Sequence, residues 1–163
     1  MNALLRPAIE EDLESILEIY NHYVLNSDAT FDFEPRTRKV GEQWFRSRTN
    51  RHPIVVADEG GRVLGWSSLS PWSSHGGYRN TCELSIYVHP TSTGRGIGRA
   101  LLRAVVASAI ELGHHCLLAR ITTENQLSSS MHLRAGFEII GVMKEAGEKH
   151  GRFLDVILLQ KLL

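Results

Sequence analysis

The chain of 163 residues is 42% hydrophobic, which is enough to build one domain with a sizeable core, and we treat residues 1–163 as a single domain. Its 18 Lys and Arg residues balance its 18 Asp and Glu residues, so no overall electrostatic field draws the protein to nucleic acid or to an anionic membrane. The sequence shows neither a secretory signal nor an apolar run of membrane-spanning length, and we therefore expect a cytoplasmic protein without nucleic-acid or membrane partners.

Helical and strand periodicities alternate through the first half of the chain. Between Leu13 and Val24, apolar residues recur at helical spacing behind an acidic first turn, which predicts an amphipathic helix. Thr37 is suited to cap a second helix, and the turn at Gly60 and Gly61 joins two apolar runs into a hairpin. The elements predicted in this half are a strand at residues 3–6, a helix at 10–26, a weakly alternating segment at 30–33, a helix after residue 37, and hairpin strands at 54–57 and 63–69.

The second half contains one strand of clear alternation, followed by helices and further strands. Along residues 81–88 the even-numbered residues are apolar and face one side, while Glu83 and Tyr87 face the other. Residues 70–80 are polar and rich in glycine and serine, which predicts a loop. Strands outnumber helices, and hairpins are mixed with crossovers, so we predict an α/β fold around a sheet of mixed strand direction. The other elements predicted here are a helix at 98–112, a strand at 116–121, a helix at 128–135, and strands at 137–144 and 153–159.

The two cysteines, Cys82 and Cys116, follow no metal-binding pattern. Neither belongs to a Cys-x-x-Cys pair, and the nearest histidines, His114 and His115, directly adjoin Cys116. Because adjacent residues on a strand point to opposite faces, this group is a poor metal site. We therefore expect no metal and interpret both cysteines as reduced, buried thiols.

A glycine-rich turn at residues 93–98 joins a predicted strand to a predicted helix. Its three alternating glycines allow several backbone N–H groups to converge on one anion at the positive end of the helix dipole, and Arg95 and Arg99 add positive charge. A plain flexible turn is the alternative, but three glycines beside two arginines cost more backbone entropy than a turn requires. The spacing lacks the third glycine of a Rossmann fingerprint and the Gly-Lys-Ser/Thr of a Walker loop, so the turn predicts a different kind of pyrophosphate site.

This turn resembles the signature Gln/Arg-x-x-Gly-x-Gly/Ala of the Gcn5-related N-acetyltransferases, with Thr93 where that family usually has Gln or Arg. The resemblance extends over nearly the whole chain, from Arg6 to Gln160. Within the family, the chain looks most like the phosphinothricin and methionine sulfoximine acetyltransferases. The matching segments are Ala29–Phe31 with Glu34–Pro35, Tyr78–Thr81, Glu83–Val88, Asn125 with Ser128 and His132, Ala146–Gly151, and Asp155–Val156 with Gln160.

The resemblance implies a mixed, mostly antiparallel central sheet that is flanked by helices and splayed at the cofactor site. It also implies direct attack of an amine on acetyl-CoA in a ternary complex, which agrees with the absence of a Gly-x-Ser-x-Gly nucleophile motif. It assigns the general base to Glu83, acting through a water molecule, although a surface glutamate is the alternative. His132 would relay a proton or supply one to the departing thiolate, with a purely structural histidine as the alternative.

The same resemblance implies three contributions to acetyl-CoA binding. The glycine-rich turn would hold the diphosphate, and the end of the preceding strand would pair with pantetheine through its main chain. Asn125 would hydrogen-bond the pantetheine amides or the thioester region, with a plain helix-start role as the alternative. The expected cofactor-binding residues are Ile86, Tyr87, Val88, Thr93, Gly94, Arg95, Gly96, Ile97, Gly98, Arg99, Asn125 and Ser128.

The acceptor that the resemblance implies is a small amino-acid-like amine, such as methionine sulfoximine or phosphinothricin. Arg79 can pair with a carboxylate in a bidentate manner, and Lys149 and His150 can meet the polar head, including across the homodimer interface that this branch of the family implies. The alternatives are a polyamine, an aminoglycoside or a protein N-terminus as acceptor, or a CoA-binding module without catalysis. The expected substrate-binding residues are Phe31, Phe33, Tyr78, Arg79, Asn80, Thr81 and Lys149.

Overall fold

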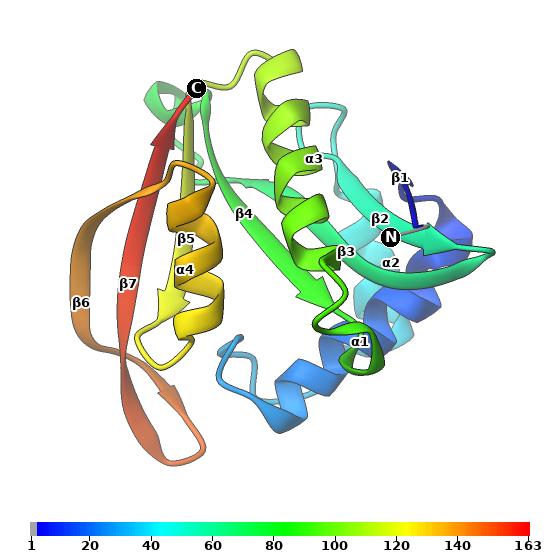
Figure 1. The fold of residues 1–163 in the computed structure, drawn as a ribbon, viewed down its shortest axis with the longest axis horizontal. Helices are drawn as coiled ribbons and strands as arrows, with labels where there is room; N and C mark the ends of the chain where they lie inside the picture. The colour runs from blue at the N-terminus through cyan, green and yellow to red at the C-terminus, as the bar shows by residue number, and fades with distance from the viewer. Residues whose placement is uncertain (1–2) are drawn as a thin grey trace.

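The computed structural model describes residues 3–163 and arranges them around one sheet of seven strands in the order β1-β2-β3-β4-β5-β7-β6 (Figure 1). Neighbouring strands are antiparallel throughout, except for the parallel pair of β4 and β5. The predicted mixed, mostly antiparallel sheet is thus confirmed. The strands are β1 (Leu4–Pro7), β2 (Ile54–Glu59), β3 (Arg62–Pro71), β4 (Thr81–Val88), β5 (Cys116–Thr122), β6 (Glu138–Lys149) and β7 (Arg152–Leu162).

Helices cover both faces of this sheet (Figure 1). On one face α1 buries Tyr20 against Trp66 of β3, and the aromatic residues of α2 pack beside them. On the other face α3 buries Leu102 against β4 and β5, and Met131 of α4 packs against the same cluster. The helices are α1 (Leu13–Asn26), α2 (Arg38–Arg46), α3 (Ile97–Glu111) and α4 (Gln126–Arg134).

The alternation predicted for β4 is confirmed. Cys82 and Leu84 belong to the core beneath α3, whereas Tyr87 packs against Trp66 on the face that α1 covers. Glu83 has the same parity as Tyr87, so its side chain points to that second face of the sheet. The strand therefore separates a buried cysteine on one side from a carboxylate on the other.

One prediction near the N-terminus differs from the structure: residues Glu10–Asp12 form a short 3-10 helix before α1, so the α-helix itself begins at Leu13. The weakly alternating residues 30–33 form no strand, because the Asp32 N–H bonds to Thr30 Oγ1 at 3.3 Å in a local turn. The other predicted elements up to α4 differ from the observed ones only at their ends.

The C-terminal hairpin is longer than predicted. β6 continues past residue 144 to Lys149, and β7 begins at Arg152, so the two strands are joined by His150 and Gly151 alone. Both turn residues have positive φ, 52° and 72°, which matches the tight turn that suits the twist of a hairpin. The polar residues between 144 and 152 lack an apolar alternation, and the sequence pattern therefore hid this part of the ladder.

Within residues 3–163, no helix combines the length and the apolar character that crossing a membrane requires.

Candidate active site

β4 and β5 separate part of the way along their length. Their parallel register runs only from Thr81 opposite Cys116 to Glu83 opposite Leu118, although β4 continues to Val88 and β5 to Thr122. Figure 1 shows the two strands diverging below this point. The edge of β4 beyond Glu83 therefore has no β5 ladder, and this is the splay that the sequence resemblance implied.

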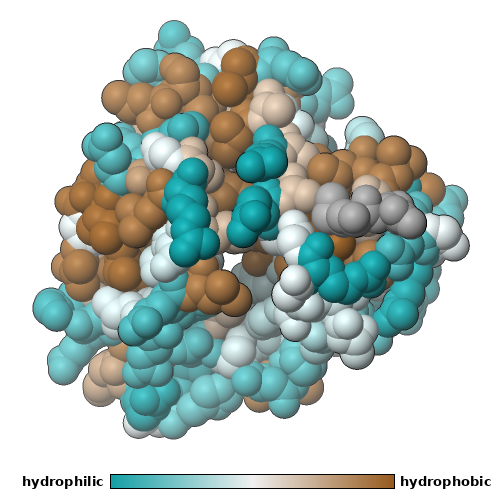
Figure 2. Space-filling view, viewed as in Figure 1, coloured by the Kyte–Doolittle hydropathy of each residue, from teal (hydrophilic) through white to brown (hydrophobic). Residues whose placement is uncertain are grey.

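A cavity of about 470 Å³ fills the opening between the two strands. The space-filling view shows the surface hollowed near the centre, between α3 and α4 (Figure 2). Because the cavity passes between strands, it brings together groups from both faces of the sheet. Its lining includes Thr30, Phe31, Asp32, Glu83, Ser85, Ile86, Tyr87, Arg120, Asn125, Ser128, His132, Met143 and Ala146.

The glycine-rich turn lies where β4 ends and α3 begins. Gly94 and Gly96 have φ values of 75° and 82°, a backbone conformation that residues with a Cβ rarely adopt. Gly96 is the N-cap of α3, and no side chain among residues 3–163 caps the helix, so its first N–H groups remain available to an anion. Arg95 is held by Glu59 of β2, with Nη2 2.7 Å from Oε1, whereas Arg99 is exposed. The turn thus presents main-chain donors, which an anionic group can approach closely.

Glu83 and Arg120 form a bidentate ion pair inside the cavity. Arg120 Nε donates to Glu83 Oε1 at 2.6 Å, and Arg120 Nη2 donates to Oε2 at 2.7 Å. Hydrogen bonding to Glu83 is the main reason that the pKa of the Arg120 guanidinium is raised. Arg120 also lies over the ring of Trp72, 5.7 Å from its centroid. In this arrangement both oxygens of Glu83 are occupied.

His132 is buried in α4, and its two ring nitrogens have different surroundings. Its Nδ1 lies 2.8 Å from the Ser128 carbonyl oxygen, and since a carbonyl only accepts, Nδ1 carries the hydrogen. Nε2 is buried and has no hydrogen-bond partner within the described residues. Burial lowers the pKa of His132, partly offset by the bond to Ser128, so the ring is neutral at pH 7 and Nε2 is a lone-pair acceptor.

Asn125 caps α4. Its Oδ1 accepts the Ser128 N–H at 3.1 Å, which fixes the start of the helix that carries His132. Both residues line the cavity, so the helix-start role and a contact to a bound molecule are compatible for Asn125. The amide nitrogen of Asn125 is the part of the side chain left for such a contact.

One wall of the cavity comes from the segment between α1 and α2. Tyr20 Oη lies 2.8 Å from Thr30 Oγ1 and donates to Asp32 Oδ2 at 2.7 Å. Burial is the main reason that the pKa of Tyr20 is raised to about 12, so the phenol stays protonated and holds the segment. The ring of Phe31 lies directly on Gly147 of β6, where even a Cβ would find no room. This wall is therefore fixed from both α1 and the C-terminal hairpin.

Several residues expected to bind substrate lie outside the cavity. Tyr78 ends a short 3-10 helix (Gly76–Tyr78) and Arg79 follows it, and both are exposed. Asn80 precedes β4 and Thr81 begins it, away from the opening. Phe33 is 68% exposed. Among the residues expected to bind substrate, only Phe31 lines the cavity of this chain.

Lys149 is not a solvated loop residue. It is 2% exposed, and its ammonium group donates to the main-chain carbonyl of Asp32 and lies 5.9 Å from the ring centroid of Phe33. This contact fastens β6 to the segment that carries Phe31. The structure therefore gives Lys149 a bracing position beside the cavity rather than one inside it.

The prediction from the sequence missed Arg120. It is the one charged residue in the strand Cys116–Thr122, and a lone arginine in an apolar run was the available signal. Arg120 and Glu83 are 37 residues apart in the sequence, and the register between β4 and β5 brings them into contact. A local sequence pattern cannot predict that register.

Comparison with known proteins gives consistent matches over the whole chain. The sequence model of the acetyltransferase (GNAT) family matches residues 13–137. The L-methionine sulfoximine/L-methionine sulfone acetyltransferase of Pseudomonas aeruginosa is 40% identical over 162 residues, which cover 98% of this chain and 94% of that protein. The L-amino acid N-acyltransferase MnaT of Escherichia coli is 38% identical over 157 residues, which cover 96% of this chain and 91% of that protein. The structure of a phosphinothricin acetyltransferase from Sinorhizobium meliloti in complex with acetyl-CoA matches with a TM-score of 0.94 and 39% identity. The match covers 100% of this chain and 89% of that one.

Proposed function

The chain belongs to the GNAT family of acetyltransferases, and from that premise we propose that it transfers the acetyl group of acetyl-CoA to the amine of a small amino-acid-like acceptor. The observation that carries the proposal is the cavity between β4 and β5, which holds Glu83, Arg120 and His132 beside the uncapped start of α3. A site of this shape admits a narrow thioester from one face of the sheet and an amine from the other.

Acetyl-CoA binds along the diverging edge of β4. The diphosphate lies on the N–H groups of residues 93–98, because glycine conformations and an uncapped helix leave these donors free. Pantetheine pairs with the main chain of residues 86–88, where β5 no longer does, although the Val88 carbonyl already accepts from Tyr23 Oη at 2.7 Å. Asn125 and Ser128 face the same channel from α4.

The chemistry is a direct attack within the ternary complex. The amine nitrogen forms a bond to the thioester carbonyl carbon, the carbon–sulfur bond breaks, and CoA leaves as a thiolate. The proton lost by the amine passes to Glu83 through water, which is general-base catalysis. His132 relays a proton within the site, because its Nε2 is an acceptor in the neutral ring.

Arg120 is the guanidinium that we assign to the acceptor's carboxylate, in place of Arg79. It lines the cavity, and its planar fork suits a carboxylate. An acceptor carboxylate that takes Arg120 withdraws it from Glu83 and frees an oxygen of Glu83 to accept a proton. Binding of the correct acceptor therefore activates the base, and an amine without a carboxylate leaves Glu83 paired.

Two further features of the proposal concern the whole protein. Exposed apolar side chains gather along the edge strand β6, and Figure 2 shows the hydrophobic surface over this side of the molecule. We assign this edge to a homodimer interface. The free, buried cysteines suit a reducing cytoplasm, where acetylation of a toxic amino-acid analogue serves detoxification.

The test is a comparison of acceptors at fixed acetyl-CoA, following CoA release with a thiol reagent. We expect methionine sulfoximine and phosphinothricin to be acetylated with a higher kcat/KM than spermidine, an aminoglycoside or a peptide with a free N-terminus. A preference for spermidine would overturn the assignment of the acceptor class. Binding of acetyl-CoA without turnover of any of these amines would overturn the catalytic proposal itself.

A further inference from the structure

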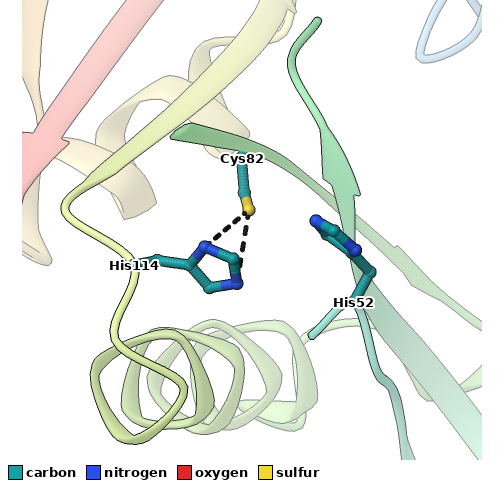
Figure 3. Close-up of side chains that lie close together, drawn as sticks. All are labelled: His52, Cys82 and His114. Atoms are coloured by element: carbon teal, nitrogen blue, oxygen red, sulfur yellow. Dashed lines mark hydrogen bonds between the residues drawn. The ribbon is translucent and has the colours of Figure 1, made fainter. Parts of the chain in front are cut away.

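Three side chains that bind metals in proteins converge at the start of β4, away from the cavity. Cys82 of β4, His52 just before β2 and His114 between α3 and β5 have ligand atoms that all lie within 4.8 Å of one another. Figure 3 shows the two imidazole rings turned toward the sulfur from different segments. Cys82 faces the core beneath α3, on the side of β4 opposite Glu83. The cluster is therefore separate from the acetyl-transfer site.

Hydrogen bonds leave one nitrogen of each ring available. His114 Nε2 lies 2.8 Å from the Arg51 carbonyl oxygen and so carries the hydrogen, while Nδ1 keeps its lone pair 3.2 Å from Cys82 Sγ. His52 Nδ1 lies 2.8 Å from Thr49 Oγ1, which leaves Nε2 as the nitrogen available to a ligand. Histidines that ligate metals in proteins are held through their other nitrogen in the same way.

The chemistry of the three donors selects the class of metal. Two imidazoles and one thiol, without a carboxylate, suit borderline and soft ions such as Zn²⁺ and disfavour Ca²⁺ and Mg²⁺. Cys82 and His114 are buried, whereas His52 is partly exposed and leaves a side of the cluster open to water. Three protein ligands with an open fourth position are a known zinc arrangement.

Arg51 is the group that a metal ion must displace. Its Nη2 lies 3.4 Å from His114 Nδ1 and also donates to Asn80 Oδ1 at 3.0 Å. The side chain is exposed, so it can swing into solvent while its carbonyl stays on His114. The guanidinium near Nδ1 lowers the affinity for a cation, and so does Arg48, whose charge also acts on His52.

We propose that His52, Cys82 and His114 form a binding site for a divalent transition metal of the zinc class. The metal bonds to Cys82 Sγ, to His114 Nδ1 and to His52, releases the thiol proton to water, and keeps a water molecule as its fourth ligand. Bound there, it ties three segments of the chain together at one end of the sheet. Its role is structural, because the cluster lies on the far side of β4 from the reacting groups.

The test uses the tag-free full chain after treatment with a chelator, titrated with Zn²⁺ by calorimetry and followed by thermal unfolding. We expect one Zn²⁺ per chain and a rise in Tm. With Co²⁺, we expect the thiolate-to-metal charge-transfer absorption that only a cysteine ligand produces. Absence of saturable Zn²⁺ binding, or of the Co²⁺ absorption, would overturn the proposal.

Variants separate this site from adventitious binding. Cys82→Ser and His114→Asn should each weaken Zn²⁺ binding by at least about 10-fold, and the exposed neighbour His115→Asn should leave it unchanged. If the buried variants fail to fold, His52→Asn, at a partly exposed position, makes the same test. Arg51→Gln should bind Zn²⁺ more tightly than the wild type. Equal affinity of His52→Asn and the wild type would refute the assignment.

Discussion

Glu83, which we propose as the base, meets Arg120 where β4 and β5 separate, so in this proposal their ion pair decides whether the base is available. Glu83→Gln removes the proton acceptor but keeps the shape of the side chain. We expect kcat to fall about 10²-fold or more, with little change in the affinity for acetyl-CoA. Glu124→Gln is the matched control, because Glu124 pairs with Arg152 at 3.2 Å outside the cavity. Equal activity of Glu83→Gln and the wild type would refute the assignment of Glu83 as the general base.

We expect substitutions of Arg120 and of Arg79 to have different effects on acceptor binding. Loss of a charge-assisted pair to the acceptor carboxylate corresponds to roughly 10- to 100-fold in affinity, so Arg120→Ala should raise the KM for methionine sulfoximine by about that factor. Arg79→Ala should leave this KM unchanged, because Arg79 lies outside the cavity. The reverse outcome would show that residues 78–81 of a second copy of the chain bind the carboxylate. Steady-state kinetics with varied acceptor distinguishes the two.

The burial of His132 predicts how the free energy of unfolding changes with pH. Burial lowers its pKa below the ordinary value of 6.5, so below pH 6.5 the unfolded chain takes up a proton that the folded chain refuses. This contribution to the free energy of unfolding is complete above pH 6.5 and is lost as the pH falls toward the folded-state pKa. His132→Asn removes it, and urea denaturation from pH 7 to pH 5 should then show a smaller loss of stability than the wild type. Parallel losses in the two proteins would contradict the buried neutral imidazole.

Single residues were predictable from the sequence where their position follows from local pattern. Glu83 follows from the alternation of β4, and the glycines at 94 and 96 follow from the turn that needs positive φ. Arg120 and the His52–Cys82–His114 cluster were not predictable, because each joins segments at least 30 residues apart through the sheet register. The sequence placed His114 beside Cys116, but the fold turns it toward Cys82.

At the scale of elements, the C-terminal hairpin braces the wall of the cavity that carries Phe31, where we expect the acceptor to bind. The ring of Phe31 packs against Gly147 of β6 and leaves no room there for an added Cβ. Gly147→Ala should push Phe31 into the cavity and raise the KM for the acceptor several-fold, with a smaller effect on acetyl-CoA affinity. Gly141→Ala, on the same strand but with no atom near its Cβ, is the control and should behave like the wild type. Steady-state kinetics with each substrate varied checks both variants.

The same hairpin shows where element prediction from sequence fails. The parts of β6 and β7 with apolar residues were predicted, whereas the polar part that carries Gly147 and Lys149 was not. Its ladder is held by a tight turn with positive φ at His150 and Gly151, and by contacts with the segment before α2. Such tertiary contacts leave no periodic trace in the sequence.

At the scale of the whole molecule, we expect substitutions at the two edges of the sheet to differ in their effect on self-association. Ile139 and Val142 of β6 are 51% and 45% exposed, and Leu4 of β1, at the opposite edge, is 64% exposed. If β6 forms the dimer interface, Val142→Glu should dissociate the protein into monomers and Leu4→Glu should not. Sedimentation velocity decides this, and a wild type that sediments as a monomer would refute the homodimer.

Main-chain N–H groups at the start of α3 hold acetyl-CoA, in our proposal, in the opening between β4 and β5. Gly96 and Gly61 have nearly equal φ values, 82° and 88°, and an added Cβ at either would meet no atom within 4 Å. A β-branched residue at either position carries the same backbone strain, about 1–2 kcal/mol, but only at Gly96 does relief of that strain move the donors. Calorimetric titration should give one acetyl-CoA per chain for the wild type and for Gly61→Val, and an affinity at least about 10-fold lower for Gly96→Val. Wild-type protein that binds no acetyl-CoA, or Gly96→Val that binds it as tightly as Gly61→Val, would contradict the account.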